Sequence, residues 1–397
     1  MADQLTKEDF NALVTSQNLA EELDKDELKT MGEKICTLFD MDEEARDEWR
    51  RRNDRWVKLA TQVTDTKSFP WPNSANVKYP LLATAAMQFA ARAYPALVPG
   101  PNLVSGLVIG RDEGGAKQQV AERVGRHMSY QLLWDMDGWE EDMDKLCITL
   151  PIVGCMFKKT YFDPTQNRNV SELVYPNDLV IDYYAKTVES AQRKTHIVWR
   201  TPNEVRERVN RGLFLDVPLG QSTGEEKPTV ANQIDGTKEP QWTETTPHRF
   251  LECHCWWDLD GDDYEEPYII TVHYDTKQVV RIVARFDLDG IETTPTKTGK
   301  EKMVKINATE YFTKFGFIPN PDGSIYDLGF GLMLGGINET INTLTNQLLD
   351  SGTMHNLQAG FLGRGIRVRA GATRFTPGEW KPVDFTGDDI KKHIFPL

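Results

Sequence analysis

Four aspartates lie within six residues of the sequence and together could bind a divalent cation. They are Asp258, Asp260, Asp262 and Asp263. Calcium loops of the EF-hand type have glycine at the sixth position, for a sharp turn, and a bidentate glutamate at the twelfth. Counting from Asp258, Gly261 is at the fourth position and Ile269 is at the twelfth. The pattern therefore favours a tight hairpin turn over a calcium site.

A second group, Cys253, His254 and Cys255, offers soft ligands for zinc. Side chains alternate between the two faces of a strand, so His254 is expected to point away from both cysteines. No second pair of the CxxC or HxxxH type occurs to complete a tetrahedral site. We therefore expect no metal at this strand.

The sequence lacks the short motifs of common catalytic sites. It has no GxxxxGK[ST] phosphate loop, no GxSxG elbow and no HExxH pair, and the glycine cluster "GRDEGGAK" has the wrong spacing. Its seven histidines are scattered. Catalytic groups can also converge from distant positions. From these motifs we expect a protein that is not an enzyme and needs no cofactor.

Composition limits the class of protein further. The chain has 397 residues, 39% of them hydrophobic, which predicts two or three folded domains. Its net charge of -14 argues against tight binding to nucleic acid, which is driven by cationic side chains. The five cysteines are few and odd in number, as in a reducing compartment such as the cytoplasm. The longest apolar stretch is broken by Gln88, Arg92 and prolines, so no membrane span is expected.

The first sixty residues predict an acidic helical arm. Residues 1–50 hold fifteen acidic and six basic side chains, a net charge of -9. One amphipathic helix carries Leu28, Met31 and Ile35 on a common face, and a second contains Trp49 and Trp56. We expect a solvated arm over residues 1–60 that is docked by a few large side chains.

Helices continue after this arm. One is expected to begin at Pro80 and end before Pro95, and the next covers about residues 116 to 136. This second helix has apolar side chains four residues apart, at Val120, Val124, Met128 and Leu132. A third is expected from Trp139 to just before Pro151.

Strands dominate the next segment. "CMFKKTYFD", "LVIDYY" and "KTHIVWRTP" are rich in aromatic and β-branched residues. A short helix follows, because Thr201, Pro202 and Glu204 form an N-terminal capping pattern and Gly212 can end it. Residues 219–247 read as an exposed polar loop, and residues 248–286 as a meander of three antiparallel strands. The fold class predicted for residues 61–327 is an α+β body.

The segment "GFGLMLGGINETINTLTNQLLDSG" predicts one helix with a narrow apolar stripe. The stripe has heptad-type spacing and consists of Leu334, Ile337, Ile341, Leu344 and Leu348. Such a stripe is suited to pack against another helix, although an ordinary surface helix of the body has a similar pattern. Asn338, Asn342 and Asn346 form a polar, uncharged face that could be hydrated or could hydrogen-bond to a neighbouring helix.

The residues after this helix are expected to form short strands with glycine turns, and they are locally basic. The basic residues include Arg364, Arg367, Arg369 and Arg374. They could form a patch for DNA, or the solvent face of a hairpin.

Three long stretches of the sequence resemble the portal proteins of tailed bacteriophages. They are "FPWPNSANVKYPLLATAAMQFAARAYPAL", the residues from "FTKFGFIPNPDGSIYDLGFG" to "LQAGFLG", and "RFTPGEWKPVDFTGDDIKKHIFPL". The resemblance implies a wing body over 61–327, a stem helix over 328–356 and the start of a β clip over 357–397. Portals of this kind continue into a second stem helix and a crown, whereas this sequence ends at Leu397.

The same resemblance implies a function. Portals form a homo-oligomeric ring, usually of twelve copies, at one capsid vertex of the virion, and are made in the host cytoplasm. Double-stranded DNA passes through the ring non-specifically during packaging and ejection. Terminase, the major capsid protein and head-completion or tail adaptor proteins are the implied partners. The implied stem interface contains the apolar stripe with Asn338 and Asn342, and the clip arginines are candidates to contact DNA or terminase.

Two other functions stay open on the sequence alone. One is a metal-dependent hydrolase of nucleic acid, with the aspartates of 258–263 as its metal ligands and the arginines of 364–374 holding phosphate. The other is a structural adaptor without a channel.

Overall fold

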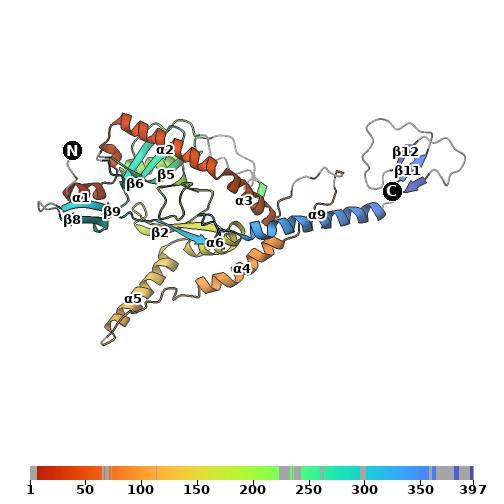
Figure 1. The fold of residues 1–397 in the computed structure, drawn as a ribbon, viewed down its shortest axis with the longest axis horizontal. Coiled ribbons are helices and arrows are strands. Elements are labelled where there is room, and N and C mark those ends of the chain that lie inside the picture. Colours follow the sequence, from red (N-terminus) through yellow and green to blue (C-terminus); the bar gives the residue numbers. More distant parts are fainter. Residues whose placement is uncertain are drawn as a thin grey trace.

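The computed structural model describes most of the chain, with gaps. The described residues are 7–64, 67, 71–72, 74–112, 114–222, 233–234, 236, 243–259, 261, 263–295, 301–356, 360–363, 380–383 and 394–396. This part of the chain is a mixed α+β structure, so the predicted fold class is confirmed. In Figure 1 a body of sheets and helices carries two projections, one containing α4 and α5 and the other formed by α9.

The elements follow one another along the chain in this order. The helices are α1 (Lys7–Thr15), η1 (Leu19–Glu21), α2 (Lys25–Ala45), α3 (Asp47–Ala60), α4 (Leu81–Leu97), α5 (Ala116–Tyr130), η2 (Gln131–Asp135), α6 (Trp139–Val153), α7 (Pro202–Asn210), η3 (Leu288–Gly290) and α9 (Phe330–Asn356). The strands are β1 (Cys155–Asp163), β2 (Arg168–Val174), β3 (Leu179–Ile181), β4 (Arg193–Arg200), β5 (His248–Trp257), β6 (Glu266–His273), β7 (Gln278–Ala284), β8 (Ile291–Pro295), β9 (Glu301–Ile306), β10 (Phe312–Gly316), β11 (Gly360–Gly363), β12 (Trp380–Val383) and β13 (Ile394–Pro396).

The body is organised around a five-stranded antiparallel sheet in the order β3-β4-β5-β6-β7. The predicted meander of three strands forms β5, β6 and β7 of this sheet, and its register pairs Cys253 with Ile270. A second sheet has the order β10-β1-β2. β8 and β9 form a two-stranded sheet, and the three short C-terminal strands pair with one another.

Helix α2 covers one face of the five-stranded sheet (Figure 1). Its buried side chains, among them Leu28, Ile35 and Phe39, pack in one cluster with Leu251 and Ile270 of the sheet. The sequence interpretation of residues 1–60 as a solvated arm docked by a few side chains is therefore wrong for α2. Most of its acidic residues face solvent, although Asp42 is buried and pairs with Arg193. Its apolar stripe forms part of the largest core, because the sheet needs a layer on that face.

Two helices continue past the prolines that were expected to end them. α4 includes Pro95 and ends at Leu97, and α6 includes Pro151 and ends at Val153. A proline lacks only its own N–H donor. Later donors maintain the last turn, since Val98 N donates to the Tyr94 carbonyl and Gly154 N donates to the Leu150 carbonyl, each at 2.8 Å. The expected ends were therefore a few residues too early.

The capped helix after β4 forms as predicted. Thr201 and Glu204 form a complete capping box at the start of α7, and Pro202 is in its first turn. Gly212 adopts a φ of 71°, the left-handed conformation that suits glycine after a helix. None of the described helices is both long enough and apolar enough to cross a bilayer.

Glycines allow α9 to start in close contact with the body. A Cβ added at Gly331 would lie 2.7 Å from Cβ of Trp56, and one added at Gly335 would lie 2.2 Å from Cζ3 of the same side chain. Trp56 is on α3 and is buried. The first two turns of α9 can lie against this ring only because these positions have no side chain.

Gly335→Ala should therefore destabilise the protein by about 1–3 kcal/mol, the usual cost of overpacking a buried contact. Gly336 is a matched control, because it is exposed and a Cβ there would have no neighbour within 4 Å. Gly336→Ala should be neutral, or should stabilise the helix by up to about 1 kcal/mol. Urea unfolding of both variants measures the difference, and equal free energies of unfolding would contradict this account of the contact.

Candidate functional site

Helix α9 has two different faces, and the first holds another segment of the same chain. Asn338, Asn342 and Asn346 are buried on this face. They are four residues apart and lie beside the extended segment 74–80 that leads into α4. We call these three asparagines, with Asp350 one further step along, the asparagine ladder.

The ladder hydrogen-bonds to backbone groups rather than to side chains. Asn346 accepts a hydrogen bond from Val77 N at 2.7 Å and donates one to the Val77 carbonyl at 3.1 Å. Asn342 accepts from Tyr79 N at 2.6 Å. Asn338 donates to the Tyr79 carbonyl at 3.1 Å and accepts from Leu82 N at 3.2 Å.

The spacing of the ladder matches the geometry of an extended chain. Four residues of α-helix rise about 6.0 Å, and two residues of extended chain span about 6.6 Å. The steps from Asn342 to Asn346 and Asp350 therefore meet every second residue of the segment, Tyr79, Val77 and Ala75, and Asp350 accepts from Ala75 N at 2.8 Å. Amide side chains suit this task because each can both donate and accept.

The ladder corrects one of the sequence interpretations. Asn338 and Asn342 were predicted at an interface between copies, or beside a neighbouring helix. Asn338 is fully buried within its own chain, and Asn342 is 7% exposed. Their partner is an irregular segment, which offers free backbone donors and acceptors that a helix or sheet does not have.

The second face of α9 is apolar and exposed. Its exposed side chains are Met333, Ile337, Leu344 and Leu348. We call them the apolar face of α9. Among the predicted stripe residues, Leu344 and Leu348 are 60% and 75% exposed, and Leu334 and Ile341 are half-buried. No described residue covers this face.

Helix α5 repeats the same arrangement on a smaller scale. Val104 N donates to Ser129 Oγ at 3.0 Å, and a Cβ added at Gly125 would lie 2.7 Å from the Val104 carbonyl oxygen, so the helix holds an extended segment on one side. The predicted stripe of Val120, Val124 and Met128 is on another side and is 43–50% exposed. Within the described residues, α9 and α5 therefore each present an uncovered apolar face.

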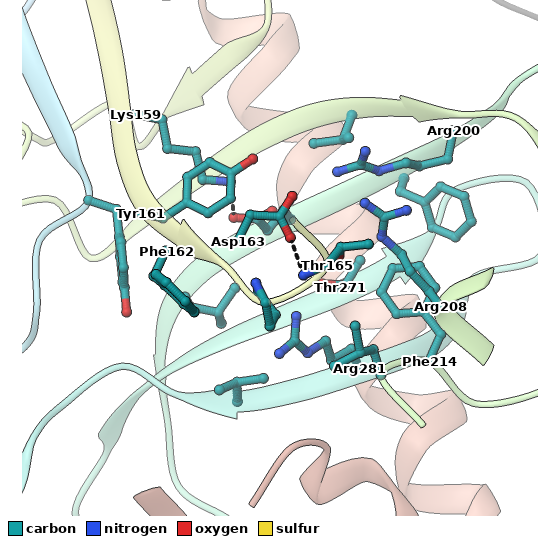
Figure 2. A pocket seen from close by; sticks show the side chains of 18 of the residues that line it. Lys159, Tyr161, Phe162, Asp163, Thr165, Arg200, Arg208, Phe214, Thr271 and Arg281 are labelled. Atoms are coloured by element: carbon teal, nitrogen blue, oxygen red, sulfur yellow. Dashed lines mark hydrogen bonds and ion pairs between the residues drawn. The ribbon is translucent and has the colours of Figure 1, made fainter. Parts of the chain in front are cut away.

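A cavity of about 200 Å³, lined by charged and apolar side chains, lies in the body between β1 and the five-stranded sheet. β1 supplies Lys159 and Asp163, β4 supplies Arg200, α7 supplies Arg208 and β7 supplies Arg281. Figure 2 shows the Arg200 and Arg208 side chains on one side of Asp163 and Lys159 on the other. The sequence does not predict this cavity, because its residues come from at least six separate elements.

Glu252 of β5 is held as an ion at the edge of this cavity. It accepts hydrogen bonds from Lys159 Nζ at 2.6 Å and from His254 Nε2 at 2.9 Å. Burial opposes its ionisation, but the Lys159 charge and the His254 hydrogen bond outweigh burial and hold the pKa of Glu252 well below its usual value. Burial also lowers the pKa of His254 to about 4, so this imidazole is neutral at pH 7.

The strand that contains Cys253, His254 and Cys255 has the alternation predicted for it. Both cysteines are buried in the cluster under α2, and the His254 ring lies on the other side against Tyr311 and Phe312. The three side chains therefore do not converge on one point. The expectation that they do not form a zinc site is consistent with this geometry.

Three other residues of types that can bind a metal, His248, His273 and Asp275, come together at the other end of the same strand. Nδ1 of His248 is 3.1 Å from Nε2 of His273, and an Asp275 carboxylate oxygen is 4.0 Å from the latter nitrogen. His273 Nδ1 is 2.7 Å from the Thr276 hydroxyl. These contacts satisfy the two imidazoles as a neutral hydrogen-bonded pair. His248 and His273 are 25 residues apart in the sequence and come together because β5 pairs with β6.

The remaining predicted site residues divide into two groups. Asp258 accepts hydrogen bonds from Gly261 N at 2.6 Å and Asp263 N at 3.1 Å, so its carboxylate closes the predicted hairpin turn. Asp260 and Asp262 lie outside the described residues, as do Arg364, Arg367, Arg369 and Arg374.

The chain matches no protein-family model and no curated protein. Its class is therefore defined by its own fold and surfaces. It is an α+β protein whose longest described helix binds its own chain on one face and leaves an apolar face uncovered.

Asn346→Ala should destabilise the protein by about 1–3 kcal/mol, because both polar groups of Val77 lose their partner in a partly buried site. Hydrogen exchange should show faster exchange at the Val77 amide. Gln347→Ala is the control, since Gln347 is the next residue and is exposed. If both variants unfold at the same urea concentration, the ladder does not hold the segment.

Acid should destabilise the body well before its carboxylates are protonated. Burial lowers the pKa of His273 to about 4 and that of His196 to about 3, whereas unfolded histidine titrates near 6.5. The unfolded chain therefore binds more protons between these values, and stability is full above pH 6.5 and falls as the pH drops toward 4. Each such histidine contributes up to about 1.4 kcal/mol per pH unit.

Urea midpoints at pH 7, 6 and 5 measure this effect. His273→Gln removes one titrating group and should make the pH dependence shallower, and His127→Gln, at an exposed histidine, should leave it unchanged. A midpoint that stays constant from pH 7 to pH 5 would show that the buried histidines do not control acid stability.

Proposed function

We propose that the protein is a portal-type subunit that assembles with copies of itself into a closed ring. The observation that carries this proposal is the uncovered apolar face of α9 on a helix that projects from the body (Figure 1). Large contiguous apolar patches on soluble proteins usually mark sites of association. The resemblance of the sequence to phage portals supplies the form of that association, with α9 as a stem helix.

The position of the two apolar faces supports a ring rather than a symmetric dimer. The faces are on α9 and α5, two helices that point in different directions from the body (Figure 1). A contact between unlike surfaces of successive copies is head-to-tail, and such contacts generate rings when the rotation closes. A dimer with twofold symmetry would instead pair one face with itself.

The charge of the chain supports a role as a conduit. A net charge of -14 disfavours tight binding to phosphates, and DNA must slide through a portal without being held. In this proposal the ring is at one capsid vertex of a phage virion, beside the major capsid protein. Terminase would dock during packaging, and head-completion or tail adaptor proteins afterwards, on the residues that follow α9. The protein itself would perform no catalysis.

Leu344→Asp should prevent ring assembly and leave the body folded. Leu344 is 60% exposed in the single chain, so the substitution costs little until a second copy buries the charge, which then costs several kcal/mol. Thr343→Asp is the control, because Thr343 is exposed and lies about 100° around the helix from Leu344. Light scattering gives the assembly mass, and negative-stain images show whether closed rings form.

We expect rings with a central hole for the unmodified chain and for Thr343→Asp, and monomers with an unchanged circular dichroism spectrum for Leu344→Asp. An unmodified chain that stays monomeric at high concentration would refute the proposal. Closed oligomers that survive Leu344→Asp would move the interface away from α9. Oligomers without a central hole would favour an adaptor.

A further inference from the structure

The cavity between β1 and the five-stranded sheet is lined by more positive than negative charge. Its lining includes the cations Lys159, Arg200, Arg208 and Arg281, and the carboxylates Asp163 and Glu252. These charges sum to +2 in a protein whose net charge is -14. The Lys159–Glu252 ion pair cancels within this sum, so the excess rests on the three arginines set against Asp163.

The three arginines lack ion-pair partners of their own. No carboxylate of the described residues lies within 4.0 Å of the guanidinium groups of Arg200, Arg208 or Arg281. The hydrogen bonds of two of them go to backbone carbonyls, from Arg208 Nη1 to Glu204 at 3.2 Å and from Arg281 Nε to Gln17 at 3.3 Å. Each guanidinium therefore keeps donors free for another acceptor, since arginine has five.

Without a bound anion, burial of the arginines and the repulsion between Arg200 and Arg208 make their charged forms costly. Burial lowers the pKa of Arg208, and the like charge of Arg200 lowers it further. Burial also lowers the pKa of Arg281. Glu172 of β2 also acts on Arg200, and burial raises the pKa of this carboxyl group. Partly buried charges are stable only when they are paired.

The Asp163 carboxylate lies beside Arg200 and Arg208 (Figure 2). Burial opposes its ionisation, but hydrogen bonds from Thr165 and the charge of Arg208 outweigh burial, so the pKa of Asp163 is lowered. One of its oxygens accepts from Thr165 N at 2.7 Å. Asp163 set against the three arginines leaves a net charge of +2 in the lining.

We propose that this cavity binds a small phosphate-type oxyanion. A phosphate carries up to two negative charges, which matches the net charge of +2 of the lining. Its tetrahedral oxygens can accept bidentate hydrogen bonds from two guanidinium groups at once. The volume of about 200 Å³ is below the roughly 300–1,000 Å³ of pockets for drug-sized ligands, so inorganic phosphate or pyrophosphate fits better than a whole nucleotide.

Titration calorimetry with inorganic phosphate and pyrophosphate tests the proposal on the full chain, with sodium chloride keeping the ionic strength constant. Arg208→Gln and Arg200→Gln should each weaken phosphate binding at least tenfold. Arg206→Gln is the matched control, because Arg206 is on the same helix α7 but is exposed and faces Asp216 at 3.4 Å. Its phosphate affinity should equal that of the unmodified chain.

A second readout separates loss of the site from loss of the fold. Arg208→Gln removes a buried like charge, so without phosphate its melting temperature should be equal to or higher than that of the unmodified chain. With phosphate, only the unmodified chain and Arg206→Gln should melt at higher temperature. If either cavity variant fails to fold, broadening of the ³¹P signal of phosphate by the unmodified chain, reversed by pyrophosphate, measures binding directly.

Three results would overturn the proposal. The first is a melting temperature that phosphate raises no more than chloride does at equal ionic strength. The second is a loss of affinity in Arg206→Gln as large as that in Arg208→Gln, and the third is binding of succinate as tight as that of phosphate. The last result would assign the cavity to carboxylates. Neither cavity variant alters the apolar face of α9, so ring formation and phosphate binding succeed or fail independently.

Discussion

The structure depends on how the chain satisfies the backbone of an extended segment that has no strand beside it. Residues 74–80 connect α3 to α4 without forming a helix or joining a sheet, so their amide and carbonyl groups need other partners. The asparagine ladder of α9 supplies them, from Ala75 to Leu82. This contact joins residues more than 250 positions apart, and it sets where α4 begins relative to α9.

The ladder also explains why an apolar face of α9 is left uncovered. A helix in a compact domain normally buries its apolar stripe and exposes its polar one. Here the polar stripe is buried, because amide side chains can satisfy backbone groups that leucines cannot. Gly331 and Gly335 occupy the contact with Trp56 at the base of the helix, and Arg55 pairs with Glu339 beside it. The leucines at 344 and 348 therefore have no part of the described body to pack against.

Local sequence signals predicted much of the fold. The capping box at Thr201 is formed entirely by neighbouring residues, and the alternation around His254 depends only on the strand period. Both were predictable for that reason. β2 was not assigned, because "RNVSELV" mixes polar and apolar residues, and its pairing with β1 decides its structure.

The functional surfaces were less predictable, because they depend on long-range contacts. The four-residue spacing of Asn338, Asn342 and Asn346 was visible in the sequence, but nothing in it identified an extended segment as their partner. The cavity needs residues from β1, β4, α7 and β7, and the His248 and His273 pair needs the register of β5 and β6. No periodicity within one element contains such information.

The two projections of the molecule are mechanically connected through the ladder. Leu82, in the first turn of α4, donates to Asn338 of α9, and α4 and α9 both pack on α6. A displacement of α9 must therefore move the start of α4 or break several hydrogen bonds at once. If another copy covers the apolar face of α9, the contact acts on a helix whose opposite face is already fixed to the body. Association would then constrain α4 as well as α9, although α4 itself takes no part in the contact.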